Sequence, residues 1–211
     1  MLFDNVPTKP AQQANDTKYY DDIDSANRAY DEYIDSHVNN VIRSWREILR
    51  LNLEYRGVSR DILYDADYCI KHHDDSKRYG HYDEDFDDGF NEYTPYRQHF
   101  YPLKNESRII SKEELEYQYD LAWNHHQKVN PHHWQYWILI RDEGKQVPLE
   151  MKEEYIYEML CDWHSFSAKD PESTAYNWYH KNKDKMVLAP KTRETVETLV
   201  EVFKNRPLSQ V

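Results

Sequence analysis

The sequence predicts an all-α protein, a single helical bundle, and three observations lead to this prediction. Glycine is scarce, with 4 residues in 211, so tight turns of the kind that join strands are few. Apolar residues recur at three- and four-residue steps over long stretches, without alternating runs rich in Val and Ile. The length suits one domain with one sizeable core.

The expected chain begins with a flexible N-terminal arm and continues as one domain over residues 19–211. Residues 1–18 are polar and contain two prolines, so they offer little to a core. From about residue 24 to residue 55, apolar residues at helical spacing predict a long helix that stops at Gly57. Ser59 then predicts the N-cap of a second helix.

The middle of the chain is expected to hold a loop followed by further helices. Residues 79–91 are strongly acidic and predict a loop. Ser111 with Glu114 forms a capping box, which predicts a helix that runs to about Gln127. Asn130 followed by Pro131 resembles an N-cap with proline at the first helical position.

This Asn-Pro pair predicts a helix that carries His132 to Ile140. Pro148 is expected to open the next helix, which runs through Asp162. Two final helices are predicted near 171–184 and 190–204.

Charge and hydropathy limit the partners that the sequence favours. The 27 basic and 39 acidic residues give a formal charge of −12, which disfavours binding to a nucleic-acid polymer. A small anionic ligand remains compatible, because a metal ion can reverse the charge inside a pocket. Mean hydropathy is −1.06 and no stretch approaches the roughly 20 apolar residues of a membrane span.

The expected location is the cytoplasm of a bacterial cell, with a phage-encoded origin open. The first residues lack the basic and apolar regions of a secretory signal. The two cysteines, Cys69 and Cys161, lie in apolar helical stretches and are interpreted as core thiols rather than a disulfide.

Histidine and aspartate residues at helical positions provide the strongest indication of chemistry. His37 lies on the apolar face of the first predicted helix, His73 and Asp74 follow the second, and Asp162 lies on an otherwise apolar helix. Such side chains in a core are costly unless they are paired or bind a metal. Imidazole and carboxylate together suit Mn, Fe, Co, Ni or Zn. The four residues therefore predict one divalent-metal site.

Histidine pairs at 125–126 and 132–133 lie further along the chain, on either side of the Asn130-Pro131 turn. Lys77 is expected to contact a substrate phosphate or to remain a solvated lysine, and Glu158 to orient a ligand or to lie at the surface.

The order His37, His73-Asp74, Asp162 resembles the H…HD…D pattern of the HD-domain superfamily of metal-dependent phosphohydrolases. The run from His73 to Lys77 is similar to the His-Asp-x-Gly/Ser-Lys form common in that group. The pieces around His126–Trp134 and Glu158–Trp163 resemble an uncharacterised HD-like family of phages and Firmicutes. That resemblance covers most of residues 30 to 200.

The resemblance implies a helical HD-like domain and hydrolysis of a small nucleotide-like phosphoester through a metal-activated water, with Asp74 and Lys77 in the catalytic machinery. It also implies a second ion beside Asp74, held by His126, which precedes Gln127 in the similar piece, and by one or both of His132 and His133. The chain lacks the glycine after the HD pair and the G-Y-P motif, so a cyclic-di-GMP phosphodiesterase is not supported. Two alternatives remain open: a di-iron oxygenase with the same ligands, and a non-catalytic phage or bacterial binding protein. The sequence leaves the oligomeric state undetermined.

Overall fold

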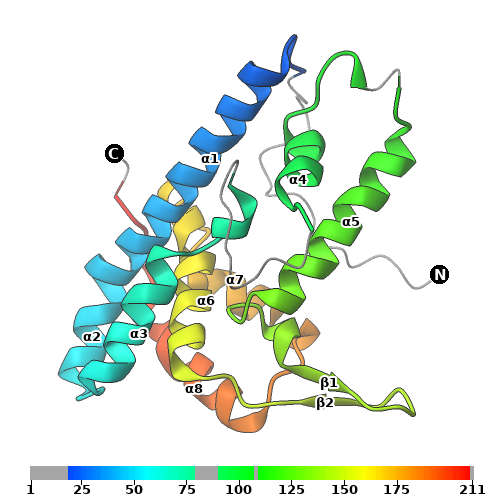
Figure 1. Cartoon of the computed structure of the whole chain (residues 1–211). Helices are drawn as coiled ribbons and strands as arrows, with labels where there is room; N and C mark the ends of the chain where they lie inside the picture. Colours follow the sequence, from blue (N-terminus) through cyan, green and yellow to red (C-terminus); the bar gives the residue numbers. More distant parts are fainter. Residues whose placement is uncertain (1–18, 79–89, 107–108, 210–211) are drawn as a thin grey trace.

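The computed structural model describes residues 19–78, 90–106 and 109–209, and confirms the all-α prediction (Figure 1). The α-helices of the described residues are α1 (Ile23–Ser44), α2 (Arg50–Tyr55), α3 (Arg60–Lys71), α4 (Tyr93–Phe100), α5 (Lys112–Val129), α6 (Glu153–Ser165), α7 (Ala175–Asn182) and α8 (Pro190–Val200). Short helical turns join them: η1 (Trp45–Leu49), η2 (Asp75–Lys77), η4 (Trp134–Trp137), η5 (Phe166–Ala168), η6 (Lys183–Lys185) and η7 (Glu201–Phe203). The expected arm, residues 1–18, and residues 79–89 of the expected acidic loop lie outside the described residues.

The long first helix and its two boundaries follow the sequence prediction. Helix α1 continues through the π-helical turn η1 into α2, so one helical rod runs from Ile23 to Tyr55. The rod ends at Gly57, whose φ of +78° is a conformation that glycine adopts without steric cost. Ser59 caps α3, because its hydroxyl accepts a hydrogen bond from the Ile62 N–H at 3.4 Å.

Two apolar clusters hold the helices together and meet on α1. The larger lies between α1, α3 and α6 and includes Val41 and Leu160, with α7 and α8 packed at its far side (Figure 1). The smaller joins α1 to α4 and α5 and includes Ile34 and Tyr96. Each fully buried side chain of this size contributes about 1.5–3 kcal/mol. His37 lies between Ile34 and Val41 on α1, so the junction of the two clusters is where polar side chains enter the interior.

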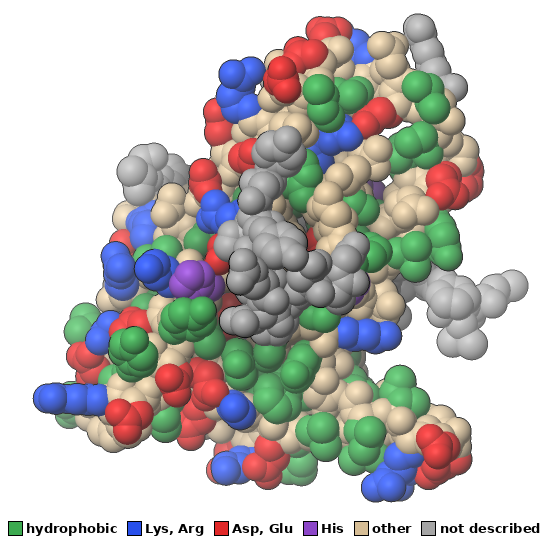
Figure 2. All heavy atoms as spheres, viewed as in Figure 1, with side chains coloured by type: hydrophobic (Ala, Val, Ile, Leu, Met, Phe, Trp, Pro, Cys, Tyr) green, Lys and Arg blue, Asp and Glu red, His purple; other side chains and the backbone are tan. Residues whose placement is uncertain are grey.

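The helix predicted for His132–Ile140 is wrong. Residues 130–133 form a turn, η4 follows, and β1 (Ile138–Ile140) pairs antiparallel with β2 (Gln146–Pro148). The Ile-Leu-Ile run favours a strand because branched side chains fit a pleated surface. Gly144, with φ +81°, lies in the turn that closes the hairpin. Figure 2 shows apolar side chains along this hairpin, and Leu139 and Ile140 are exposed.

Three other boundaries complete the comparison with the prediction. Pro148 ends β2, so the expectation that it opens a helix is wrong and α6 begins at Glu153. Helix α4 was not predicted. Ser111 caps α5 as predicted, accepting from the Glu114 N–H at 3.1 Å, and α7 and α8 with their 3₁₀ extensions match the two final helices. No helix in the described ranges combines the length and apolar character needed to cross a bilayer.

Candidate metal centre

Four side chains from α1, the turn after α3, and α6 meet in the interior as a first cluster, made of His37, His73, Asp74 and Asp162. His37 Nε2 lies 3.3 Å from His73 Nε2 and 3.2 Å from Asp162 Oδ1. Asp74 Oδ2 lies 3.6 Å from His37 Nε2 and 3.5 Å from His73 Nε2. Ligands about 2.1 Å from one ion lie about 3.0–3.4 Å apart at octahedral or tetrahedral angles. The spacing therefore fits one ion after small adjustments.

The turn after α3 explains how two adjacent residues reach the same point. Asp74 adopts a left-handed conformation with φ 58° and ψ 23°, which aspartate tolerates better than most residues at a cost of about 1–2 kcal/mol. Its carbonyl accepts a hydrogen bond from the Lys77 N–H at 2.9 Å, which closes the turn. A strained backbone at a buried polar residue is typical of functional sites.

Three further imidazoles form a second cluster, made of His126, His132 and His133, on the other side of Asp74. Their ligand atoms lie within 4.8 Å of one another. Asp74 Oδ1 lies 3.2 Å from His126 Nε2 and 3.8 Å from His132 Nε2. Asp74 therefore presents Oδ2 to the first cluster and Oδ1 to the second.

The second cluster also contains the clearest sign that something should bind there. Asp74 Oδ1 and the Nε2 atoms of His126, His132 and His133 are buried and have no hydrogen-bond partner among the described residues. Each unpaired buried polar atom costs about 1–3 kcal/mol. The three imidazoles offer ligand atoms within 4.8 Å of one another. Asp74 Oδ1 and His126 Nε2 lie 3.2 Å apart, so their mutual attraction offsets part of this cost. The donor set thus fits a cation.

Buried partners on the opposite ring nitrogens orient these histidines. Glu158 Oε1 accepts from His73 Nδ1 at 2.9 Å and from His132 Nδ1 at 3.1 Å, so one carboxylate serves both clusters. Ser165 Oγ donates to the Asp162 carbonyl at 2.7 Å, so it accepts from His37 Nδ1 at 3.2 Å. A proton on Nδ1 leaves the Nε2 lone pair free to bind a metal.

Glu92 orients the second cluster in the same way, and the sequence analysis missed it. Its side chain is 1% exposed, and its Oε2 accepts from His126 Nδ1 at 3.0 Å and from the Ser76 hydroxyl at 2.8 Å. His125 contacts the other carboxylate oxygen. No local signal identifies Glu92, because it follows an acidic run in which one more glutamate is unremarkable.

Electrostatics differ between the two clusters. Burial disfavours a charged His73, but the carboxylates of Asp74, Asp162 and Glu158 outweigh it and raise the pKa of His73 well above its usual value. Burial also opposes ionisation of Asp74, yet Lys77 and the neighbouring imidazoles hold the pKa of Asp74 well below its usual range. In the first cluster, ionised carboxylates therefore lie beside a protonated His73.

In the second cluster, two of the imidazoles, His132 and His133, are held neutral. Burial lowers the pKa of His132, and it lowers the pKa of His133 further with help from the adjacent His132 and His126 rings. Neutral imidazole is the form that binds metal ions.

Lys77 lies at the edge of the first cluster. Its Nζ donates to Asp74 Oδ2 at 3.0 Å and lies 5.0 Å from the centre of the Tyr96 ring. The side chain is 13% exposed, and Asp162 is 17% exposed, whereas His73, Asp74, His126 and His132 are at most 4% exposed. Lys77 therefore has a position from which its ammonium group can reach a ligand of the centre.

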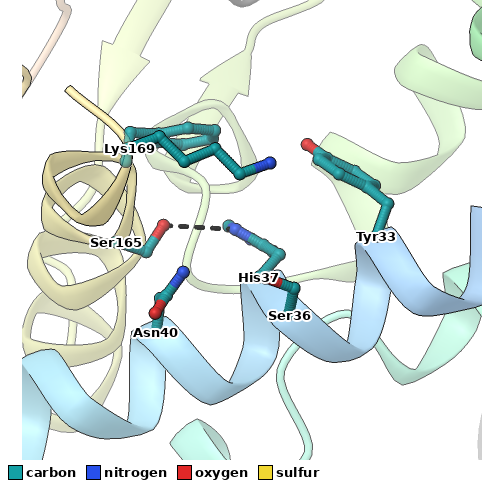
Figure 3. Close-up of a pocket in the computed structure, with 7 residues that line it drawn as sticks. Tyr33, Ser36, His37, Asn40, Ser165 and Lys169 are labelled. Carbon is teal, nitrogen blue, oxygen red and sulfur yellow. Dashed lines mark hydrogen bonds between the residues drawn. The ribbon is translucent and has the colours of Figure 1, made fainter. Parts of the chain in front are cut away.

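A small pocket borders the first cluster on the side of His37 that faces Ser165 (Figure 3). Tyr33 stacks on the His37 ring at 6.3 Å, and Phe166 contacts the same ring at 5.3 Å. Lys169 Nζ lies 5.3 Å from the centre of the Tyr33 ring. None of these neighbours was singled out from the sequence, because only the fold places η5 beside α1.

The structure brings together all seven side chains that the sequence analysis selected as ligands. It also places Glu158 directly behind His73 and His132 rather than at the surface. His132 and His133 both belong to the same cluster.

A helical fold with clustered histidines and aspartates in its interior defines a class of protein, an all-α protein whose buried polar centre could bind a metal ion. Within that class, the chain belongs to the family DUF5662, a family of unknown function, whose model matches residues 26–202. The match includes every residue of both clusters. No curated protein and no solved structure shows significant similarity to the chain.

Proposed function

We propose that this protein is a divalent-metal-dependent phosphohydrolase that acts on a small nucleotide-like phosphoester. The observation that carries the proposal is the position of Asp74 between the two clusters, with one carboxylate oxygen toward each. Such a carboxylate would bridge two ions, one held by the first cluster and one by the second. A pair of ions would lower the pKa of a shared water and offset charge on a phosphoryl group.

The chain's own residues support this chemistry in three ways. Glu158 and Glu92 hold the imidazoles in the orientation that exposes Nε2. Most of the ligand side chains are deeply buried, which strengthens electrostatic interactions among them. Lys77 can exchange its contact with Asp74 for one with phosphoryl oxygens, since an ammonium group is a strong donor to phosphate.

The ligand order along the chain adds support from resemblance. His37, His73-Asp74 and Asp162 follow the order of the HD-domain superfamily, and the four converge in space. We therefore propose an HD-like domain with Mn, Fe, Co, Ni or Zn as the metal, because imidazole and carboxylate donors suit these ions. A formal charge of −12 favours a small anionic substrate over a nucleic-acid polymer.

The test begins with the metal content of freshly purified, tag-free protein, measured by elemental mass spectrometry. The protein is then loaded with each of the five metals and assayed for phosphate release from nucleoside mono-, di- and triphosphates and cyclic nucleotides. A His73→Ala/Asp74→Ala double variant serves as the control and should lose both metal and turnover. Bound metal without turnover on the whole panel would contradict the proposal.

Two other results would direct attention to the alternatives. Iron as the native metal, with oxygen consumption in the presence of a small organic substrate, would indicate a di-iron oxygenase. The absence of metal after loading, with a melting temperature that chelators leave unchanged, would indicate a binding protein whose centre is structural.

A further inference from the structure

The pocket beside His37 differs in charge from the rest of this acidic chain. Its lining comes from α1 and from the end of α6 with η5, and it includes one cation, Lys169, and no carboxylate. The whole chain has 39 acidic and 27 basic residues, so an acid-free pocket next to a carboxylate-rich centre is a local exception. The one charged group of a mostly apolar lining is therefore a cation, which can pair with an anion.

Hydrogen-bond donors converge on this space. Figure 3 shows the Lys169 ammonium group and the Tyr33 hydroxyl turned toward each other beside the His37 ring. Lys169 contacts the Tyr33 ring and makes no ion pair with any described residue. The Asn40 carbonyl oxygen faces Arg43 Nη1 at 3.4 Å, which leaves the Asn40 amide nitrogen to point into the pocket.

The Tyr33 hydroxyl is a hydrogen-bond donor at neutral pH, because an ordinary phenol keeps its proton there. The ring itself is not free to stack on a planar ligand, because His37 lies parallel to it and Lys169 covers it. The pocket therefore suits an oxyanion better than a nucleobase.

The place of the pocket connects it to the candidate metal centre. The His37 ring forms part of the pocket wall, while its Nε2 belongs to the first cluster. A group bound in the pocket is thus separated from the first cluster by one imidazole ring. That arrangement matches a substrate with one phosphate at the reacting centre and a second anionic group close by.

We propose that Lys169, Tyr33 and Asn40 form a phosphate-binding subsite for a non-reacting phosphate group of the substrate. The role as a substrate subsite depends on the proposed phosphohydrolase function, whereas phosphate binding in the pocket depends only on these donors. The preferred substrates would then carry at least two phosphate groups.

The first experiment measures the rise in melting temperature of the purified protein with inorganic phosphate, against sodium chloride at equal ionic strength. The wild type should be stabilised, and Lys169→Ala should lower the phosphate affinity about tenfold, the effect of one charge-assisted hydrogen bond. Tyr33→Phe should lower it about fivefold. Lys191→Ala is the matched control, because Lys191 is 74% exposed and contacts Glu150 on another part of the surface.

An unchanged phosphate affinity in Lys169→Ala, or no stabilisation of the wild type, would overturn the subsite. The second experiment separates it from the proposed function. If turnover exists, Lys169→Ala should raise KM about tenfold for diphosphate-bearing substrates at similar kcat, with little change for monophosphates. Hydrolysis that Lys169→Ala leaves unaltered would reject the subsite alone, and phosphate binding without hydrolysis would reject only the enzyme.

Discussion

The two clusters of the candidate metal centre use the same kinds of side chain but differ in how the protein supports them. In the first cluster, two imidazoles face two carboxylates. A proton on His73 can therefore offset part of the carboxylate charge that a metal ion would neutralise. The second cluster has three imidazoles and one carboxylate oxygen, Asp74 Oδ1, and the buried Nε2 atoms of the imidazoles have no hydrogen-bond partner among the described residues.

The difference also extends to the backbone. The first cluster lies on α1, α6 and the turn after α3, which pack around the larger apolar cluster. The second lies on the last turn of α5 and in the turn at residues 130–133. The first cluster is therefore built by the fold, whereas the second should depend more on a bound ion for its order. Four predictions test this contrast, from the largest expected effect to the smallest.

Asp74→Asn should remove both ions, because it replaces the carboxylate that both clusters share with an amide whose nitrogen cannot bind a metal. We expect metal content to fall from two ions per chain to almost none in elemental analysis. Asp75→Asn is the matched control, since Asp75 pairs with His72 and Arg78 rather than with the centre. Retention of either ion by Asp74→Asn would show that Asp74 does not join the clusters.

Single-cluster variants should each remove one ion. His37→Ala should empty the first cluster and His133→Ala the second, so each variant should retain about one ion per chain. His72→Ala, next to His73 but hydrogen-bonded to Asp75, should retain both. Loss of both ions in His133→Ala would mean that the second cluster supports the first, which is the reverse of the contrast drawn above.

Substitution of Glu158 and of Glu92, the two carboxylates that orient the candidate ligands, should affect different numbers of ions. Glu158→Gln should weaken binding at both clusters about 10–100-fold, because Glu158 holds one histidine of each. Glu92→Gln should weaken only the second ion by a similar factor, because it holds His126 alone among the ligands. Competition with a chelator of known affinity measures both. Equal effects of the two variants on both ions would contradict the separate assignment.

Substitution of His164, a buried histidine outside the candidate metal centre, should have the smallest effect on metal content. It is fully buried, its Nδ1 accepts from the Ala175 N–H at 3.3 Å, and its Nε2 lies 3.3 Å from Ser167 Oγ, so both ring nitrogens have partners. His164→Gln should therefore leave metal content unchanged. Burial lowers the pKa of His164 from 6.5 to about 4, so the unfolded chain binds this proton more readily.

The stabilising contribution of neutral His164 is thus fully present above pH 6.5 and is lost as the pH falls toward 4. Between pH 7 and pH 5, the wild type should lose about 2 kcal/mol more in free energy of unfolding than His164→Gln. Denaturant unfolding at the two pH values measures the difference. Parallel losses in the two proteins would show that His164 titrates normally.

The sequence by itself determined the helical class, the long helix that ends at Gly57, and the caps at Ser59 and Ser111. These features follow from local rules, since apolar periodicity, capping and adjacent polar residues are visible within a few positions. The seven candidate ligands were selected by the cost of polar side chains on apolar helices and by the resemblance of their order to the HD-domain superfamily. Only the fold brings them together.

Tertiary structure alone decided the rest. Residues 134–148 form a 3₁₀ turn and a hairpin, in which β1 pairs with β2. The Asn130-Pro131 pattern reports only on its own neighbourhood and carries no information about this pairing. Glu92 gained its role from His126, 34 residues away in the chain. Lys169 reached His37 only because η5 returns to α1. Partners this distant in sequence leave no local pattern, because hydrogen bonds and charges act through space rather than along the chain.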